Sequence, residues 1–292
     1  MNKVRKAIIP AAGYGTRFLP ATKAQPKEML PIVDKPIIQY VVEECVASGI
    51  EDIIIVGGWH KRSIEDHFDD PYELEKKLEE SGKTKELKMV RDIARMANFV
   101  YVRQKGEHYG NGVPLLNVAH LVGDEPFAVI WGDEFIHATP PRLKQCISFF
   151  EKQKNIGGVI SAIRVNDDEV SRYGIAEGKE VKPGLIKIKS IIEKPQPHET
   201  PSRLAAHGAY VFTPELIDEL KKVKPGKGNE IWLVDAITAL AKKKDVYALE
   251  VKNATYYDTG NKLSFIKANI AFGLEHPETK KGLREYLKGL NL

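Results

Sequence analysis

Apolar segments of strand length alternate along this chain with helical patterns, and this alternation limits its fold more than any other feature. The segments that read as buried strands span residues 6–10, 52–56, 98–103, 127–131, 158–163, 187–192, 208–212 and 246–250. Ile38, Val41 and Cys45 recur at helical spacing before Ser48-Gly49, which is a typical stop signal. Strands that alternate with helices predict an α/β fold with a mostly parallel sheet covered on both faces. In such sheets ligands bind beyond the carboxyl ends of the strands, and every candidate site residue below follows an expected strand.

The composition is that of a globular protein and excludes several functional classes. The 292 residues suffice for one large domain with additions, and 42% of them are hydrophobic. The net charge of +4, from 44 basic and 40 acidic residues, is too small and too evenly spread to indicate a nucleic-acid partner. Cys45 and Cys146 lack redox or metal-binding spacing, so we expect two buried free thiols in a reducing compartment.

Neither a membrane partner nor export is expected. No segment approaches the roughly 20 apolar residues that a bilayer-spanning helix needs. The basic segment Met1–Lys6 precedes an apolar stretch that is too short for a signal peptide and that contains Pro10. We therefore expect a cytoplasmic protein.

The loop after the first expected strand, A-A-G-Y-G-T-R-F-L-P, has the composition of a polyphosphate site. Gly13 and Gly15 lack a Cβ, so the backbone can turn tightly and present N–H groups to an anion. Arg17 adds a planar set of donors that suits phosphate oxygens, and Lys27 adds a mobile point charge. The loop is not a dinucleotide fingerprint, because Phe18 stands where the third glycine is needed, and the sequence has no G-x-x-x-x-G-K-[ST] loop.

The motif G-x-G-T-R-x-x-P followed by P-K-E-M-L-P resembles the signature of the sugar-1-phosphate nucleotidylyltransferases. The longer run P-A-T-K-A-Q-P-K-E-M-L-P-I-V-D-K-P is most similar to the bacterial UTP–glucose-1-phosphate uridylyltransferases, also called UDP-glucose pyrophosphorylases. The resemblance extends from Val4 to about Gly273. It implies a Rossmann-like, mostly parallel mixed sheet in a catalytic domain over residues 1–260, with a helical insertion at about 63–97. Residues 261–292 form a helical tail that is available for a subunit interface in a homodimer or homotetramer.

Two aspartates are candidate ligands for Mg²⁺. Asp133 follows an apolar strand through Gly132, where a carboxylate is desolvated unless a cation or a donor meets it. Asp258 follows the last expected strand. Mg²⁺ typically binds one or two carboxylates together with phosphate oxygens and water. The resemblance implies the same two positions, although its usual G-D-D reads Gly132-Asp133-Glu134 here.

The nucleotide base has a candidate partner in Gln104, which follows a strand. Its carboxamide carries donors and an acceptor that match the edge of uracil, whereas cytosine presents the wrong pattern. Thymine has the same edge as uracil, so Gln104 leaves dTTP open as a substrate. Together with the resemblance, these considerations assign nucleotide binding to Ala11, Ala12, Gly13, Gly15, Thr16, Glu28, Gln104 and Gly112.

The resemblance also implies a sugar-phosphate site later in the chain. In Glu193-Lys194-Pro195 the carboxylate binds sugar hydroxyls and the lysine holds the phosphate of a sugar 1-phosphate. Gly174 and Gly208 match glycines that approach the sugar, although Ala209 stands where arginine is usual.

The reaction implied is an in-line displacement at the α-phosphorus of UTP by a phosphate oxygen of glucose 1-phosphate. The attacking phosphate is largely dianionic at neutral pH, with a second pKa of about 6, so no general base is required. Arg17 and Lys27 are the expected catalytic residues, which neutralise phosphate charge. Thymidylyl transfer and another sugar 1-phosphate are alternatives. Val113 and Trp232 replace a histidine and an amide of the family pattern, which motivates a further alternative, a catalytically silent sugar-nucleotide-binding regulator.

Overall fold

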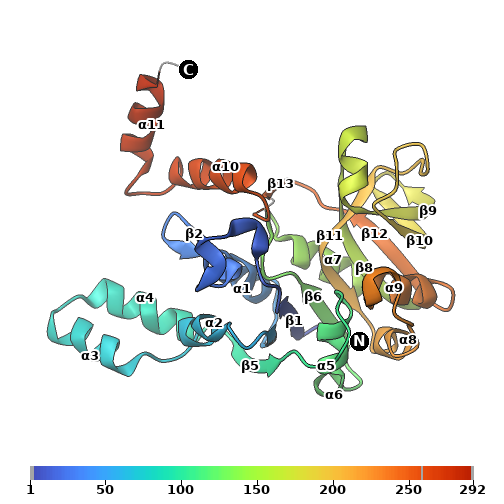
Figure 1. Cartoon of the computed structure of the whole chain (residues 1–292), viewed down its shortest axis with the longest axis horizontal. Helices are drawn as coiled ribbons and strands as arrows, with labels where there is room; N and C mark the ends of the chain where they lie inside the picture. Colours follow the sequence, from blue (N-terminus) through green and yellow to red (C-terminus); the bar gives the residue numbers. More distant parts are fainter. Residues whose placement is uncertain (1–2, 258, 291–292) are drawn as a thin grey trace.

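The computed structural model describes residues 3–257 and 259–290, and it is built around one large sheet (Figure 1). Within these residues the sheet has nine strands in the order β5-β4-β1-β6-β11-β8-β12-β10-β9. The strands are β1 (Lys6–Ala11), β4 (Asp52–Gly57), β5 (Asn98–Arg103), β6 (Phe127–Ile130), β8 (Ile156–Arg164), β9 (Gly174–Lys182), β10 (Leu185–Glu193), β11 (Leu204–Phe212) and β12 (Asp245–Glu250).

Most strands of this sheet run in the same direction. β5, β4, β1 and β6 are parallel neighbours, and β8 and β12 form a second parallel pair. β11 runs antiparallel to both β6 and β8, and β10 runs antiparallel to β12 and β9. In the described part of the chain, seven of the nine strands therefore share one direction, which confirms the mostly parallel mixed sheet predicted from the sequence.

The expected strands are all present, although several are longer than predicted. The sequence analysis missed β9, one of the two edge strands, because G-I-A-E-G-K-E-V-K is exposed over most of its length and has no apolar run. An edge strand is less enclosed than a central one and can remain polar, so its sequence pattern is weak. It also missed two short ribbons, β2 (Pro31–Ile32) with β3 (Lys35–Pro36) and β7 (Phe135–Ala138) with β13 (Ala254–Tyr257).

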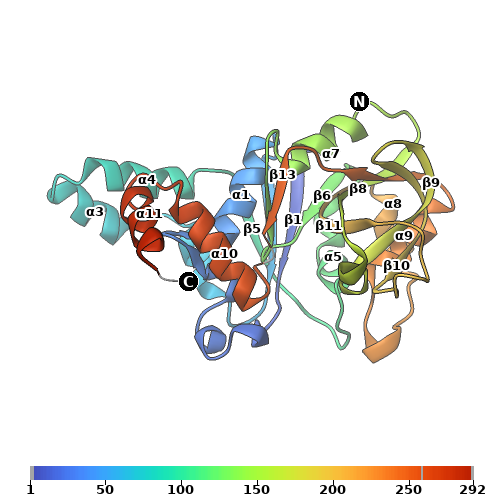
Figure 2. The same cartoon turned by 90° about the horizontal axis from the view of Figure 1, so that it is seen from above.

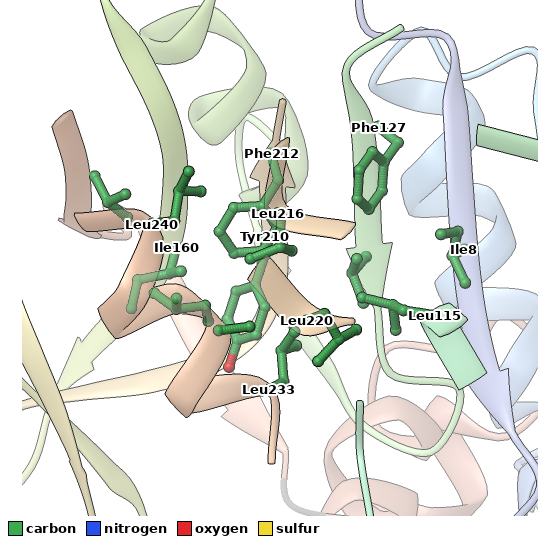
Figure 3. Packing of buried hydrophobic residues seen from close by; sticks show 14 of the residues in the cluster. Ile8, Leu115, Phe127, Ile160, Tyr210, Phe212, Leu216, Leu220, Leu233 and Leu240 are labelled. Atoms are coloured by element: carbon green, nitrogen blue, oxygen red, sulfur yellow. The ribbon is translucent and has the colours of Figure 1, made fainter. Parts of the chain in front are cut away.

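Helices cover both faces of the sheet. One face carries α1 (Ile37–Ala47), α2 (Arg62–His67), α7 (Arg142–Phe150) and α10 (Lys262–Gly273). The other face carries α5 (Val113–Asn117), α6 (Ala119–Val122), α8 (Glu215–Leu220) and α9 (Leu233–Ala241). Figure 3 shows the core on this second face, in which Leu115, Leu220 and Leu233 lie around aromatic and aliphatic residues of the strands.

Neighbouring residues of a central strand enter different cores. Ile8 of β1 packs in the core formed with α5, α8 and α9, whereas Ile9 packs in the core formed with α1 and α7, and both are fully buried. Successive side chains of a strand point to opposite faces, so a strand covered on both sides reads as a continuous apolar run. This is why the central strands are recognisable from the sequence.

Two helical segments extend away from the sheet (Figures 1 and 2). α3 (Tyr72–Glu80) and α4 (Thr84–Ala94) pack against each other within the stretch where the sequence predicts an insertion. α11 (Lys280–Gly289), all of which is described, follows α10 and contains no buried residue. Short 3-10 helices lie in the loops: η1 (Thr16–Phe18), η2 (Ala21–Lys23), η3 (Lys27–Met29), η4 (Asp167–Arg172) and η5 (Lys227–Asn229).

The two cysteines are buried free thiols, as predicted. Cys45 lies in α1 and Cys146 in α7, and burial raises the pKa of each thiol. No helix in residues 3–257 or 259–290 combines the length and the apolar character that a membrane span needs.

Candidate active site

A cleft of about 690 Å³ lies beyond the carboxyl ends of β1, β4, β5 and β6. Its walls come from the loops that follow these parallel strands, where α/β sheets bind ligands. The predicted residues that line it are Ala11, Ala12, Gly13, Lys27, Glu28, Gln104 and Asp133. Residues far apart in the sequence therefore share one cleft.

Gly15 turns the loop that follows β1. Its φ of +66° is left-handed, and it is the N-cap of η1. A Cβ on Gly15 would lie 3.1 Å from Cβ of Lys27 and 3.2 Å from Cγ2 of Thr22, so both the backbone conformation and the available space favour glycine. The Thr22 hydroxyl donates to the carbonyl oxygen of Gly15 at 2.7 Å. The loop is therefore held with its backbone against Lys27.

Lys27 and Asp133 form the central ion pair of the cleft. Lys27 begins η3, and Asp133 follows β6 through Gly132. The Lys27 ammonium donates to Oδ2 of Asp133, and the two side chains are 26% and 31% exposed. Burial lowers the pKa of Lys27, but the carboxylates of Asp133 and Glu28 outweigh it and raise the pKa above its ordinary value. Lys27 therefore stays protonated at physiological pH and presents a positive charge to the cleft.

Thr16 and Arg17 lie on the exposed side of the glycine loop and do not line the cleft. Nη1 of Arg17 donates to the carbonyl oxygen of Gly260 at 3.3 Å. The neighbouring Thr259 hydroxyl donates to the carbonyl oxygen of Asp133. These bonds connect residues 259–260 with both the glycine loop and the end of β6. The predicted metal ligand Asp258 lies outside the described residues.

Gln104 is placed by its backbone at the end of β5. Its N–H donates to the carbonyl oxygen of Gly57 at 2.9 Å, which fixes the loop after β5 beside the loop after β4. The half-buried carboxamide faces the same cleft as Ala11 and Ala12. Gln104, the predicted partner of the base, therefore lines the same cleft as Ala11 and Ala12, the small residues predicted to leave space for it.

The cleft also contains residues that the sequence analysis did not select, namely Tyr14, Trp59, His60, Arg103 and Tyr109. The Tyr14 and His60 rings stack with centroids 5.4 Å apart, and Trp59 is 81% exposed. The signal that could have found this loop is Gly57-Gly58, a glycine pair directly after an apolar strand. A Cβ on Gly58 would lie 3.4 Å from the carbonyl oxygen of Ala12, so the two loops approach closely.

Gly112 has a packing reason for being glycine. It is buried, and a Cβ there would lie 2.8 Å from Cδ1 of Leu220 and 3.0 Å from Cγ2 of Ile231. Gly110 lines the cleft instead, with a φ of +112° and no space for a Cβ beside the carbonyl oxygen of Ile231. Binding of a nucleotide by Gly112 stays a prediction.

Val113 and Trp232, the two departures from the family pattern that motivate the regulator alternative, do not line the cleft. Val113 is buried in the core with α8 and α9. Trp232 precedes α9, and its ring lies next to Gly226, where a Cβ would be 3.5 Å from Cδ1 of the indole. Neither substitution therefore introduces a side chain into the cleft.

Gly174, Glu193 and Lys194 form one group. Gly174 lies opposite Glu193 in the β9–β10 ladder, and a Cβ on it would be 3.0 Å from Oε2 of Glu193. The N–H of Lys194 donates to the carbonyl oxygen of Tyr173 at 3.0 Å, and its ammonium lies 3.9 Å from Oε1 of Glu193. Burial raises the pKa of Glu193, and Lys194 opposes this shift only in part.

The position of this group corrects the expectation that every candidate residue follows a strand. Gly174 is the first residue of β9, and Gly208 lies inside β11, where the register shifts. Glu193 ends β10, which runs against the main strand direction. The group lies on the carboxyl-end side of β6 because β11 extends past the end of β6 and pairs with the start of β9, with Ala205 opposite Ile175. None of its three members is among the residues that line the cleft.

Gly208 connects the two parts of the site. Its φ is +38°, and its carbonyl oxygen accepts a hydrogen bond of 3.1 Å from the N–H of Trp131, which lines the cleft. A Cβ on Gly208 would lie 2.8 Å from Cδ1 of Trp131 and would collide with the carboxylate of Glu134. The backbone therefore approaches the end of β6 as closely as only a glycine allows.

Known proteins resemble the chain over nearly its whole length. A family model described as nucleotidyl transferase matches residues 6–273. The UTP–glucose-1-phosphate uridylyltransferase 1 of Staphylococcus saprophyticus is 47% identical over 289 residues, which cover 99% of each chain. A solved UDP-glucose pyrophosphorylase complexed with UDP-glucose is 42% identical, with a TM-score of 0.83 over 94% of this chain and 100% of the other. A UTP-bound UGPase from Acinetobacter baumannii is 34% identical, with a TM-score of 0.88 over 99% of this chain and 100% of the other. The chain therefore belongs to the nucleotidyl transferase family and, within it, to the UTP–glucose-1-phosphate uridylyltransferases.

Proposed function

We propose that this protein transfers a uridylyl group from UTP to glucose 1-phosphate and releases pyrophosphate. The observation that carries the proposal is the single cleft that brings together the glycine loop, Lys27, Asp133 and Gln104. A polyphosphate site, an acidic metal site and a base-reading amide are the parts that such a reaction needs in one place.

The reaction needs no covalent intermediate. An oxygen of the glucose 1-phosphate dianion attacks the α-phosphorus of UTP, and the bond from that phosphorus to the bridging oxygen of the β-phosphate breaks. Two anions must approach each other, so the main task of the site is to compensate charge. Lys27 neutralises charge at the transferred phosphoryl group, and Arg17, on the exposed side of the glycine loop, binds the leaving pyrophosphate. Lys194 holds the phosphate of the acceptor.

Mg²⁺ is the proposed cofactor, with Asp133 and Asp258 as its ligands. Asp133 supports this assignment because its carboxylate lies at the tip of β6, inside the cleft, and its present partner is itself a cation. When bound, Mg²⁺ would shield the triphosphate and polarise the phosphoryl oxygens. The other described residues do not add a cluster of three or more His, Cys, Asp or Glu side chains that could hold a metal ion.

Gln104 and Glu193 are the proposed selectors of base and sugar. The Gln104 carboxamide matches the uracil edge, and the backbone of Ala11 and Ala12 lines the space beside it. Glu193 accepts hydrogen bonds from glucose hydroxyls next to Gly174, whose lack of a side chain leaves space for the carboxylate. The pKa of Glu193 is raised because burial destabilises its charged form. Hydrogen bonds from a bound sugar would compensate part of that lost solvation, which is consistent with a binding role.

A panel of substrates tests the function. Each of UTP, dTTP, CTP, ATP and GTP is combined with glucose, galactose or mannosamine-type sugar 1-phosphates, and pyrophosphate release is followed with and without Mg²⁺. We expect the highest kcat/KM for UTP with glucose 1-phosphate. A higher value for dTTP, or for another sugar, would reassign the substrate. The absence of turnover with every pair would instead support a sugar-nucleotide-binding regulator.

We further propose that the protein acts in the cytoplasm as a homodimer or homotetramer, with residues 1–260 as the catalytic domain and the tail as the contact. Leu283, Tyr286 and Leu287 recur at helical spacing on α11, which has no buried residue. A second copy of the chain would cover these side chains. Light scattering of the full chain and of residues 1–276 tests this, because loss of the tail should leave a monomer.

A further inference from the structure

Trp59 is the most exposed large hydrophobic residue in the part of the chain that the structure describes, with an exposed fraction of 81%. It lines the cleft, as do Tyr14 and Tyr109, whose exposed fractions are 62% and 61%. The proposed mechanism gives none of these three rings a task. A single exposed apolar side chain needs no explanation, but several exposed aromatic rings around one cleft indicate a ligand that covers them.

A tight turn after β4 carries Trp59 to the cleft. The N–H of Lys61 donates to the carbonyl oxygen of Gly58 at 3.3 Å, so Trp59 and His60 are the two central residues of the turn. Nη1 of Arg103, the last residue of β5, donates to the same carbonyl oxygen. The turn is therefore attached to the end of the neighbouring strand.

His60 joins this turn to the glycine loop on the other side. Its ring stacks on the Tyr14 ring with centroids 5.4 Å apart and an angle of 3° between the planes. The Trp59 indole meets the His60 ring at 67°, also with centroids 5.4 Å apart. Such ring contacts stabilise the orientation of the rings. Trp59 is thus supported from two sides, although its own ring is exposed to the cleft.

The strand order places the turn beside the proposed site of the base. β4, which leads to Trp59, lies between β5, which leads to Gln104, and β1, which leads to the glycine loop. Asp133 follows β6, on the other side of β1. A UTP molecule that extends from Gln104 to Lys27 therefore has its base beside Trp59, whereas its phosphates lie farther along the cleft.

We propose that the Trp59 indole stacks on the face of the uracil of UTP. An aromatic side chain stacks on any base, since every base has a π face, whereas a carboxamide distinguishes one base edge from another. Gln104 therefore selects the base, and Trp59 supplies affinity that does not depend on which base it is. This inference rests on the proposed function, and it adds a contact with the face of the base to the proposed contact with its edge.

The substitution Trp59→Ala tests the stacking. With glucose 1-phosphate and Mg²⁺ present, its KM for UTP should rise by about 10- to 100-fold, and the inhibition constant of CTP against UTP should rise by a similar factor. Its kcat should change by less than about threefold, because the ring does not touch the reacting atoms. Trp59→Phe keeps an aromatic ring and should retain most of the affinity, whereas Trp59→Leu, which keeps only apolar volume, should not.

Inorganic tripolyphosphate separates a contact with the base from a general effect on the cleft. It carries three phosphates and no base, so its inhibition constant against UTP should be the same for Trp59→Ala and the wild type. The matched control variant is Tyr72→Ala, which removes an aromatic ring that is 76% exposed outside the cleft and should leave KM for UTP unchanged.

An unchanged KM for UTP in Trp59→Ala would overturn the inference. So would an equal rise for UTP and tripolyphosphate, because the ring would then support the glycine loop instead of binding the base. A wild-type protein without UTP turnover would contradict the proposed function instead. The stacking is then tested by calorimetry, in which Trp59→Ala should still weaken UTP binding and leave tripolyphosphate binding unchanged.

Discussion

The Lys27 ammonium donates a hydrogen bond to Oδ2 of Asp133, so the proposed phosphate-binding cation and the proposed metal-binding carboxylate are partners in this structure. In the proposed reaction Lys27 neutralises the transferred phosphoryl group, and Asp133 binds Mg²⁺. In that proposal, binding of UTP and Mg²⁺ would replace one counter-charge by another at each residue: phosphate would replace the carboxylate beside Lys27, and the metal ion would replace the ammonium beside Asp133. Neither charge has to be left uncompensated in a partly buried site, which would be costly.

The substitution Lys27→Met tests the first half of this exchange. It removes the charge while keeping most of the side-chain volume, so kcat should fall by at least about 100-fold, as for other groups that stabilise charge in a transition state. KM for UTP should change much less, because the glycine loop and Gln104 remain. The control is Lys23→Met, an exposed lysine of the same loop, which should keep wild-type kcat. An unchanged kcat in Lys27→Met would remove this residue from the chemistry.

The substitution Asp133→Asn tests the second half. A neutral amide is a weaker ligand for Mg²⁺, so the Mg²⁺ concentration that gives half-maximal velocity should rise by at least about tenfold. The measurement is a Mg²⁺ titration of the initial velocity at saturating UTP. Asp124→Asn changes an exposed aspartate and should titrate like the wild type. If Asp133→Asn kept the wild-type Mg²⁺ requirement, this carboxylate would not be a ligand.

The substitution Gln104→Ala tests base recognition. Loss of a matched pair of hydrogen bonds to a base edge costs about 1–3 kcal/mol, so kcat/KM for UTP should fall by roughly 10- to 100-fold. The kcat/KM for CTP, which lacks the matching pattern, should change little. The ratio of kcat/KM for UTP to kcat/KM for CTP should therefore fall. Gln153→Ala, at a distance from the cleft, serves as the control. An equal loss for UTP and CTP would mean that Gln104 supports the loop rather than reads the base.

The position of Asp133 in the fold could be predicted from the local sequence pattern, whereas that of Gly174 could not. Asp133 follows a central strand whose residues are buried on both faces, so its position at the cleft could be predicted from the apolar run before it. Gly174 begins the polar edge strand β9, and its position beyond the end of β6 depends on the contact between β9 and β11. That contact joins segments without any local pattern, so only the motif, and not the periodicity, indicated the site.

The Lys61–Glu28 pair was not predictable for a different reason. Nζ of Lys61 lies 2.7 Å from Oε2 of Glu28, and both side chains are buried. The two residues are 33 positions apart, in loops after different strands. The motif indicated Glu28 as a nucleotide-binding residue, but no sequence pattern joins it to Lys61. Nothing in the sequence shows that either side chain is buried.

His207 gives the stability of the protein a pH dependence of its own. It lies in β11, is 1% exposed, and neither ring nitrogen has a hydrogen-bond partner within the described part of the chain. The Tyr173 and Tyr256 rings pack against it, with centroids at 4.7 and 4.2 Å. Burial, assisted by the Arg142 guanidinium, lowers the pKa of His207 to about 3. The folded protein therefore keeps this imidazole neutral.

The unfolded chain binds a proton at His207 below a pKa of about 6.5, whereas the folded chain does so only near 3, so the free energy of unfolding must fall as the pH drops between these values. Between pH 7.5 and pH 5.0 the loss from this one group should be about 2 kcal/mol. The substitution His207→Phe keeps an aromatic ring and removes the titration. In urea unfolding followed by circular dichroism, the variant should lose about 2 kcal/mol less than the wild type over this pH range. His198→Phe, at an exposed position, should follow the wild type. If His207→Phe lost as much stability as the wild type, the buried imidazole would have to gain its proton in the folded state, and the unpartnered ring nitrogens would need a partner.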